Sequence, residues 1–258
     1  MRITLIVGAD AAPFARGLAA GLTPDETLTV IAPVVRDRWL TGLKSCPDLD
    51  GLLGVGDAPP THGVADELVH LGYSRSTQRR TDADIAVQLI RTELLGAGYS
   101  LTEATAATAR RRSLGFALLP SSDDRAELNV VVVGADGPHA IHVEELLEAP
   151  GDHDVQDVVL VAEAWSVSSA ARADLEATDL VVLGPSSRTL AIDPVLRTPG
   201  LLDLIDPSTP VLVVQHRDEA PPALIRAAGL SEPDPGSPET VPAEVAAVLA
   251  RARQLAAS

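Results

Sequence analysis

Residues 82–124 read DADIAVQLIRTELLGAGYSLTEATAATARRRSLGFALLPSSDD, and their pattern predicts two helices followed by a strand. Ile85 and Leu89, like a second apolar pair after them, are spaced four residues apart, as on one face of a helix. Two glycines close behind this run indicate where the helix ends. A helix over 85–95 is therefore the first element of the stretch.

The second half of the stretch predicts another helix and then a strand. Ser100 or Thr102 can cap a helix that runs to three arginines at its electronegative C-terminal end. The apolar run 116–119 then predicts a strand that ends at Pro120. Beyond it lie two hydroxyls and two carboxylates, those of Ser121, Ser122, Asp123 and Asp124. A strand that ends in such groups is where α/β proteins tend to bind ligands.

The rest of the chain alternates short apolar runs with helical segments. Expected strands cover 3–7, 28–32, 155–162, 179–183 and 210–214. This alternation predicts an α/β fold, a Rossmann-like domain with a mostly parallel central sheet and helices on both faces. Asp136-Gly137, between two alternating runs, predicts a hairpin.

Length and composition predict one large folded domain. The chain has 258 residues, of which 46 % are hydrophobic and 2 % aromatic, so its core must be aliphatic. We expect a domain over 1–230, a Pro-rich linker over 231–241 and a C-terminal helix over 242–258.

Charge and cysteine content exclude several classes of protein. A formal net charge of −16 repels nucleic acid and anionic membranes, so we expect neither as a partner. Cys46 is the single cysteine, which is typical of a reducing compartment, and we expect a cytoplasmic protein. The start of the chain enters a strand-like run directly, without the layout of a signal peptide.

The loop after the first expected strand is a candidate phosphate-binding turn. Gly8 precedes an expected helix, and a backbone that approaches a phosphate needs glycine. The loop over 8–13 has no further glycine, and Asp10 would place a negative charge where a phosphate should lie. An ordinary turn between strand and helix is the alternative.

Two further loops contain candidate ligand-binding groups. Asp48 and Asp50 lie two residues apart, so their carboxylates would point the same way in an extended segment and could hold Mg²⁺. The alternative is an aspartate that caps a helix over 49–53. Gly184 and Ser186 follow an expected buried strand, where hydroxyl and N–H groups suit an anion, although plain turns share this composition. His142 is more typical of a packed strand residue than of a ligand.

Three segments carry a resemblance to a known family. Residues 81–84, 91–101 and 119–127 resemble the motifs G-D-R-D, R-T-x-x-L-x-x-G-Y-x-L and L-P-x-x-D-D-R-x-E of the 2-phospho-L-lactate transferases, which act in deazaflavin coenzyme F-420 biosynthesis. The chain looks like a shortened, divergent member of the actinobacterial branch. The resemblance implies transfer of a phospholactyl or phosphoenolpyruvyl group from a guanosine diphosphate-linked donor to a deazaflavin acceptor, with Mg²⁺.

The resemblance also implies roles for individual residues. Asp37, Asp48 and Asp50 would hold the metal ion. Phosphates would lie near Gly8, Arg91, Gly184 and Ser186. Catalytic roles would fall to Asp48, Asp50, Asp123 and Asp124, the last two orienting the acceptor or structuring their loop.

Several family positions are altered, which leaves other hypotheses open. In place of the family's Asn-x-x-Asp-Asp-x-Trp the chain has 33–39, PVVRDRW, so one acid has become Arg36. The arginine of G-D-R-D is Ala83 and a family histidine is Gln88. The chain is thus either a divergent transferase, a non-catalytic paralogue acting as regulatory or partner subunit, or an enzyme for a smaller phosphorylated ligand. Valine-rich edge strands would allow a homodimer or a hetero-oligomer with an intact family member.

Overall fold

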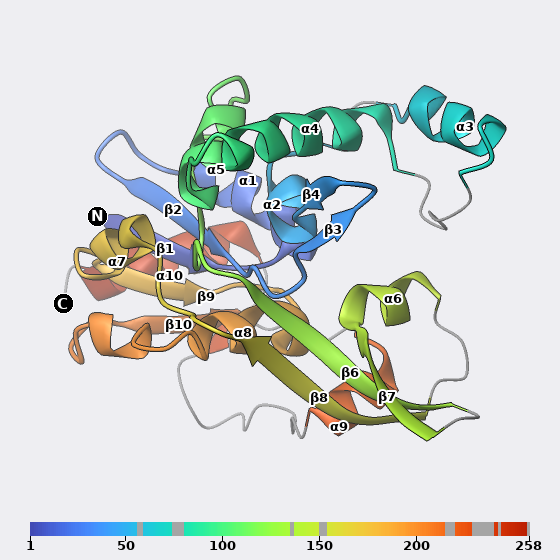
Figure 1. Ribbon diagram of the computed structural model, residues 1–258. Coiled ribbons are helices and arrows are strands. Elements are labelled where there is room, and N and C mark those ends of the chain that lie inside the picture. Colours follow the sequence, from blue (N-terminus) through green and yellow to red (C-terminus); the bar gives the residue numbers. More distant parts are fainter. Residues whose placement is uncertain are drawn as a thin grey trace.

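The computed structural model describes residues 1–55, 59–73, 80–134, 137–149, 154–214, 220–228, 240–241 and 244–256 (Figure 1). Its centre is a six-stranded parallel sheet in the order β11-β10-β9-β1-β2-β5. The strands are β1 (Arg2–Ile6), β2 (Thr27–Ala32), β5 (Ala117–Pro120), β9 (Leu180–Leu183), β10 (Val211–Val214) and β11 (Thr240–Val241). The predicted α/β fold with a mostly parallel sheet is confirmed.

Helices cover both faces of this sheet, as predicted. They are α1 (Ala12–Ala20), α2 (Pro47–Leu52), α3 (Gly63–His70), α4 (Asp82–Gly96), α5 (Leu101–Ala109), α6 (Val143–Glu148), α7 (Ser169–Leu175), α8 (Asp193–Leu196), α9 (Pro222–Ala227) and α10 (Val245–Ala256). Short helical turns are η1 (Ala9–Ala11), η2 (Arg188–Ile192) and η3 (Leu202–Leu204). Among the helices in the described ranges, none is long and apolar enough to cross a membrane.

Two cores lie on opposite faces of the sheet. Alternate residues of β1 point to opposite sides, so Leu5 joins the larger core with α1, α2 and α10, whereas Ile6 joins the smaller one with α7 and α8. Four of the five β1 residues are buried, which is why the strand reads as a continuous apolar run in the sequence.

A second sheet projects from the parallel one (Figure 1). It is antiparallel, with the order β7-β6-β8, and consists of β6 (Ala126–Gly134), β7 (Gly137–His142) and β8 (Asp154–Ala162). The predicted hairpin is therefore confirmed as β6 and β7, although its turn residues 135–136 lie outside the described residues. A small hairpin, β3 (Arg38–Leu40) with β4 (Leu43–Ser45), precedes α2.

The helix pair of residues 82–109 forms as predicted, but the face it buries differs. Ser100 is the cap of α5, where it forms a reciprocal capping box with Glu103. In α4 the apolar Leu89 and Ile90 are 54 % and 46 % exposed. The polar Arg91 is instead fully buried, because it has an acidic partner inside the molecule (below).

The predicted C-terminal helix exists as α10, which packs on α1. Gly21 makes room for it, since a Cβ there would lie 2.5 Å from Leu249 Cδ1. Of the predicted linker, residues 231–239 lie outside the described residues, and the next two form β11 beside β10.

The strand order places a topological switch beside β1. From β1 the chain proceeds to β2 and β5 on one side, and later continues from β9 to β10 and β11 on the other. The loops that follow β1 and β9 therefore diverge at neighbouring carboxyl ends, which is where open α/β sheets form their ligand crevices.

Gly184 permits the close approach of β9 to β1 at this switch. A Cβ at residue 184 would overlap Val7 Cγ1 and come within 3.0 Å of Leu5 Cδ1, both in the fully buried core. We expect Gly184→Ala to lower the free energy of unfolding by about 1–3 kcal/mol, the usual cost of overpacking. Denaturant unfolding measures this change. In Gly96→Ala, where the added Cβ meets nothing within 4 Å, we expect no loss. Equal losses of stability in the two variants would contradict the conclusion that β9 can pack closely on β1 only with glycine at residue 184.

Candidate anion site at the carboxyl edge of the parallel sheet

Backbone and hydroxyl donors converge where β1 and β9 end. The N–H of Gly8 donates to Ser186 Oγ (3.0 Å), and that hydroxyl donates to Asp10 Oδ1 (2.5 Å). The N–H of Ser187 donates to the other oxygen of the same carboxylate, Asp10 Oδ2 (2.9 Å). Gly8 and Ser186 thus lie together as expected, but their loops bind Asp10, a carboxylate of the chain itself.

Asp48 fills the neighbouring part of the same edge. Its Oδ1 accepts the N–H of Ala9 (2.9 Å) and a guanidinium N–H of Arg36 (3.2 Å). A Cβ on residue 8 would lie 2.7 Å from this oxygen, so glycine is needed for Asp48 to reach the loop. The edge is therefore built to bind anionic oxygens, and two internal carboxylates occupy it.

The expected extended arrangement of Asp48 and Asp50 is wrong. Both lie in the first turn of α2, whose N-cap is Cys46. The alternative was therefore right that the segment is helical but wrong that an aspartate caps it. Residues two apart on a helix do not face each other. Asp48 accordingly points to the sheet edge and Asp50 to the opposite side, where it contacts Arg91.

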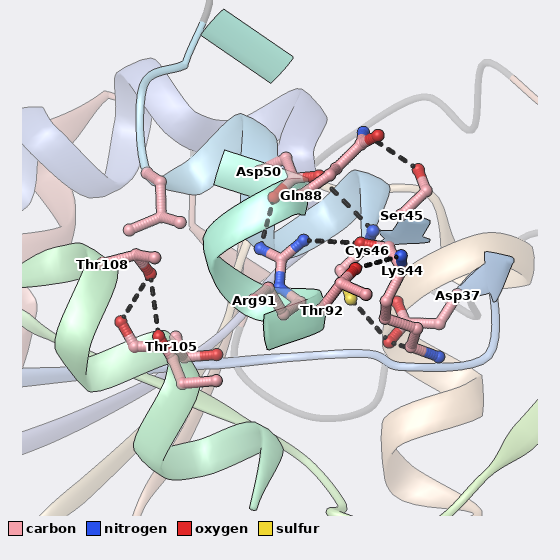
Figure 2. Close-up of polar contacts among 12 residues, drawn as sticks. Asp37, Lys44, Ser45, Cys46, Asp50, Gln88, Arg91, Thr92, Thr105 and Thr108 are labelled. Carbon is pink, nitrogen blue, oxygen red and sulfur yellow. Dashed lines mark hydrogen bonds and ion pairs between the residues drawn. The ribbon is translucent and has the colours of Figure 1, made fainter. Parts of the chain in front are cut away.

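Arg91 lies in the core rather than near a ligand. Its side chain is fully buried, with Nη2 2.5 Å from Asp50 Oδ1 and Nη1 donating to the carbonyl of Lys44 (Figure 2). The expectation that Arg91 binds phosphate does not fit this position. Arg91 instead ties α4 to α2 and β4.

Asp37, the third expected metal ligand, has partners of its own. Its Oδ2 accepts the thiol of Cys46 (3.0 Å) and lies 3.4 Å from Lys44 Nζ (Figure 2). Burial raises the pKa of Asp37, an effect that the Lys44 charge and the thiol donor partly offset. Burial, with the nearby Asp37 charge, likewise raises the pKa of Cys46, so its thiol stays protonated.

These three acids do not fit a shared Mg²⁺ site. Each pairs with a different protein cation: Asp37 with Lys44, Asp48 with Arg36, and Asp50 with Arg91. Asp37 and Asp48 each keep one oxygen without a hydrogen bond, but the two acids belong to separate pairs. Within the described ranges, no group of three or more His, Cys, Asp or Glu side chains is arranged to hold a metal ion.

Asp123 and Asp124 structure their loop, one of the two roles considered for them. Asp123 accepts the N–H of Thr102 in the first turn of α5 (2.7 Å). Asp124 accepts both the N–H and the hydroxyl of Ser166. His142 also has a structural contact, since its Nδ1 accepts the N–H of Glu144 at the start of α6.

A cavity of about 250 Å³ lies beside α2 and is lined in part by Asp50, Arg80, Gln88 and Glu144. Arg80 is 7 % exposed and donates to Gln88 Oε1 and Thr41 Oγ1. Sequence reasoning did not identify Arg80, because no local pattern reveals a buried arginine whose partner Thr41 lies 39 positions away in the chain.

The family model described as 2-phospho-L-lactate transferase CofD matches residues 3–216. Among curated relatives, the phosphoenolpyruvate transferase of Kitasatospora aureofaciens is 33 % identical over 220 residues, which cover 80 % of this chain and 68 % of that protein. The enzyme of the same name from Streptomyces griseus is 34 % identical over 219 residues, covering 80 % and 69 %. That of Mycobacterium tuberculosis H37Rv is 31 % identical over 204 residues, covering 73 % and 62 %.

A solved structure shares the fold. The crystal structure of a UPF0052-family protein from Bacillus halodurans superposes with a TM-score of 0.56 at 15 % sequence identity, covering 83 % of this chain and 68 % of that one. At this identity the likeness concerns the fold alone.

The titration of Asp48 should make stability depend on pH. Burial raises its pKa from 3.8 to about 6, although Arg36 and the N–H of Ala9 oppose the rise. Between these values the folded chain retains a proton that the unfolded chain has released, so stability falls as pH increases. Relative to Asp48→Asn, wild type should lose about 3 kcal/mol between about pH 4 and pH 7. Urea unfolding at several pH values measures the difference in unfolding free energy between wild type and Asp48→Asn. The titration of the other acids affects both proteins equally and therefore does not contribute to this difference. A constant or rising difference would contradict the assignment.

The Arg91–Asp50 pair offers a test of a structural role for Arg91. Arg91→Met leaves the Asp50 carboxylate buried without its cation, and we expect a loss of about 3–5 kcal/mol in the free energy of unfolding. The double variant Arg91→Met, Asp50→Asn should recover part of the loss, because no unpaired charge is then buried. A loss below about 1 kcal/mol in Arg91→Met would contradict a structural role for Arg91, because exposed ion pairs contribute no more than this.

Proposed function

Because this chain belongs to the 2-phospho-L-lactate transferase CofD family, we propose that it is a divergent transferase of phosphorus-containing groups in deazaflavin coenzyme F-420 biosynthesis. Its donor would be lactate or enolpyruvate joined through its 2-oxygen to the outer phosphate of guanosine diphosphate, so that this phosphate is transferred together with the acid. Its acceptor would be the hydroxyl of a deazaflavin. The matched relatives named phosphoenolpyruvate transferases support the type of reaction.

The proposed reaction needs positioning and charge neutralisation more than covalent participation of the protein. The acceptor oxygen forms a bond to the phosphorus that carries the acid. The bond from that phosphorus to the bridging oxygen breaks, guanosine monophosphate leaves, and the hydroxyl proton is released. Because the three expected metal ligands do not form a joint site, we assign no step to a metal ion.

One observation supports an anionic ligand at this edge. The N–H groups of Ala9 and Ser187 and the hydroxyl of Ser186 all donate to carboxylate oxygens. They lie at the topological switch of the sheet, where such donors serve phosphates in α/β folds. A diphosphate would take the place of the Asp10 carboxylate and use its donors.

A second candidate, a non-catalytic paralogue acting as partner or regulatory subunit, rests on the same contacts. Asp10 and Asp48 already satisfy the donors, and a phosphate would have to displace a negative charge that the protein itself supplies. Under this candidate the internal carboxylates are permanent and the edge is part of the framework.

Removing the Asp10 carboxylate separates the two candidates. Isothermal titration with guanosine diphosphate would compare wild type with Asp10→Ser. Two like charges about 4 Å apart near a protein surface repel by about 4 kcal/mol, so the transferase proposal expects Asp10→Ser to bind at least about tenfold more tightly. Asp203→Ser removes the same charge from an exposed residue of η3 and should leave the affinity unchanged.

The absence of nucleotide binding in folded wild type would contradict the transferase proposal and favour the paralogue, whether or not Asp10→Ser binds. A gain of equal size in Asp203→Ser would show that net charge, rather than the edge itself, determines the affinity.

A further inference from the structure

Arg36 lies in the segment between β2 and β3 and contacts acids from two other parts of the chain. Its Nε donates to Glu144 Oε1 at 2.6 Å, and its Nη1 donates to Asp48 Oδ1 at 3.2 Å. Glu144 lies at the start of α6 and Asp48 in α2. One guanidinium therefore joins two carboxylates at the carboxyl edge of the parallel sheet.

Both carboxylates need a cation there. The side chains of Asp48 and Glu144 are 1 % and 5 % exposed, and that of Arg36 is 19 % exposed. Two carboxylates so close together and out of water would repel each other strongly. Asp10 adds a third negative group that acts on the same guanidinium.

Arg36 remains protonated in this environment. Burial lowers the pKa of Arg36, but the charges of Asp48 and Glu144 and the hydrogen bond to Glu144 together raise it above its usual value. The guanidinium thus carries a full positive charge at any pH at which the protein is folded.

We propose that Arg36 is a built-in cation that takes the place of a divalent metal ion at this edge, so that Asp48 and Glu144 are neutralised without any metal. A guanidinium resembles such an ion in that it serves several carboxylate oxygens at once, and it differs in that it cannot dissociate. This inference rests on the contacts of Arg36 and not on the proposed transferase activity.

The proposal has two consequences for the protein as it exists. Wild type should bind neither Mg²⁺ nor Mn²⁺ at this edge, and neither ion should raise its unfolding temperature. Replacing Arg36 by an uncharged side chain of similar length should leave two converging carboxylates, the number with which Mg²⁺ sites are commonly built. The variant should therefore gain a divalent-cation site.

The test compares wild type with Arg36→Met by thermal unfolding and by counting bound Mn²⁺ with electron paramagnetic resonance. We expect Arg36→Met to unfold at a lower temperature in chelator and to recover part of the loss in millimolar Mg²⁺ or Mn²⁺, because a ligand that binds only the folded state stabilises it. It should bind a single Mn²⁺ per chain, and wild type none.

Arg38→Met is the matched control. Arg38 forms an ion pair with Glu148 at the end of α6, and both side chains are about as buried as Arg36. The Arg38 charge also acts on Glu144, but Arg38→Met leaves Arg36 in place between Asp48 and Glu144. This variant should also lose stability, but with no response to either cation. If Arg36→Met alone does not fold, the double variant Arg36→Met, Glu144→Gln leaves only one carboxylate unpaired and should fold with weak Mn²⁺ binding at most.

Stoichiometric Mn²⁺ binding by wild type that disappears in Asp48→Asn would overturn the proposal, since the edge would then hold a metal beside Arg36. A folded Arg36→Met that gains neither Mn²⁺ binding nor cation-dependent stability would overturn it as well. Neither result depends on nucleotide binding, so failure here is distinguishable from failure of the proposed function.

Discussion

Buried carboxylates must be neutralised or hydrogen-bonded within the protein, and this constraint organises the region around α2. Asp48 and Asp50 are both almost fully buried, and each has a guanidinium from a different segment, Arg36 and Arg91. Leaving either acid without its partner would cost several kcal/mol. The segments that supply the cations, before β3 and within α4, are thereby fixed against α2. The ion pairs of this region are part of the framework as much as the aliphatic core is.

The same constraint explains why carboxylates of the chain itself lie at the carboxyl edge of the parallel sheet. Parallel strands that diverge at a switch point present N–H groups to the crevice, and such groups need an acceptor. Asp10 and Asp48 supply carboxylate oxygens from within the chain. The lack of a side chain at Gly8 leaves room for the Asp48 carboxylate, and the lack of one at Gly184 lets β9 pack closely on β1. An architecture suited to a phosphate is therefore combined with internal anions, and this combination gives rise to both candidate functions.

Local pattern predicted much of the fold. The strands around β1, β2, β9 and β10 were evident as apolar runs, and the helices of the 82–109 region as spaced apolar pairs with capping residues. The orientation of α4 was not predicted, because hydrophobicity favoured burial of Leu89. In the structure Arg91 is buried instead, through its ion pair with Asp50. Periodicity cannot reveal a charged residue whose partner lies 41 positions away in the chain.

Composition and order of the residues determined that the chain forms an α/β fold with a parallel sheet, that Gly8 and Ser186 each follow a strand, and that its family is recognisable. The pairing of those two strands came from the structure. Tertiary structure alone decided what each acid does. The family resemblance grouped Asp37 with Asp48 and Asp50, but the helical turn of α2 directs the last two apart, and a different cation reaches each of the three. A carboxylate has the same sequence signature whether it faces a ligand or a guanidinium, since the identity of its partner is set by packing and not by its neighbours in the chain.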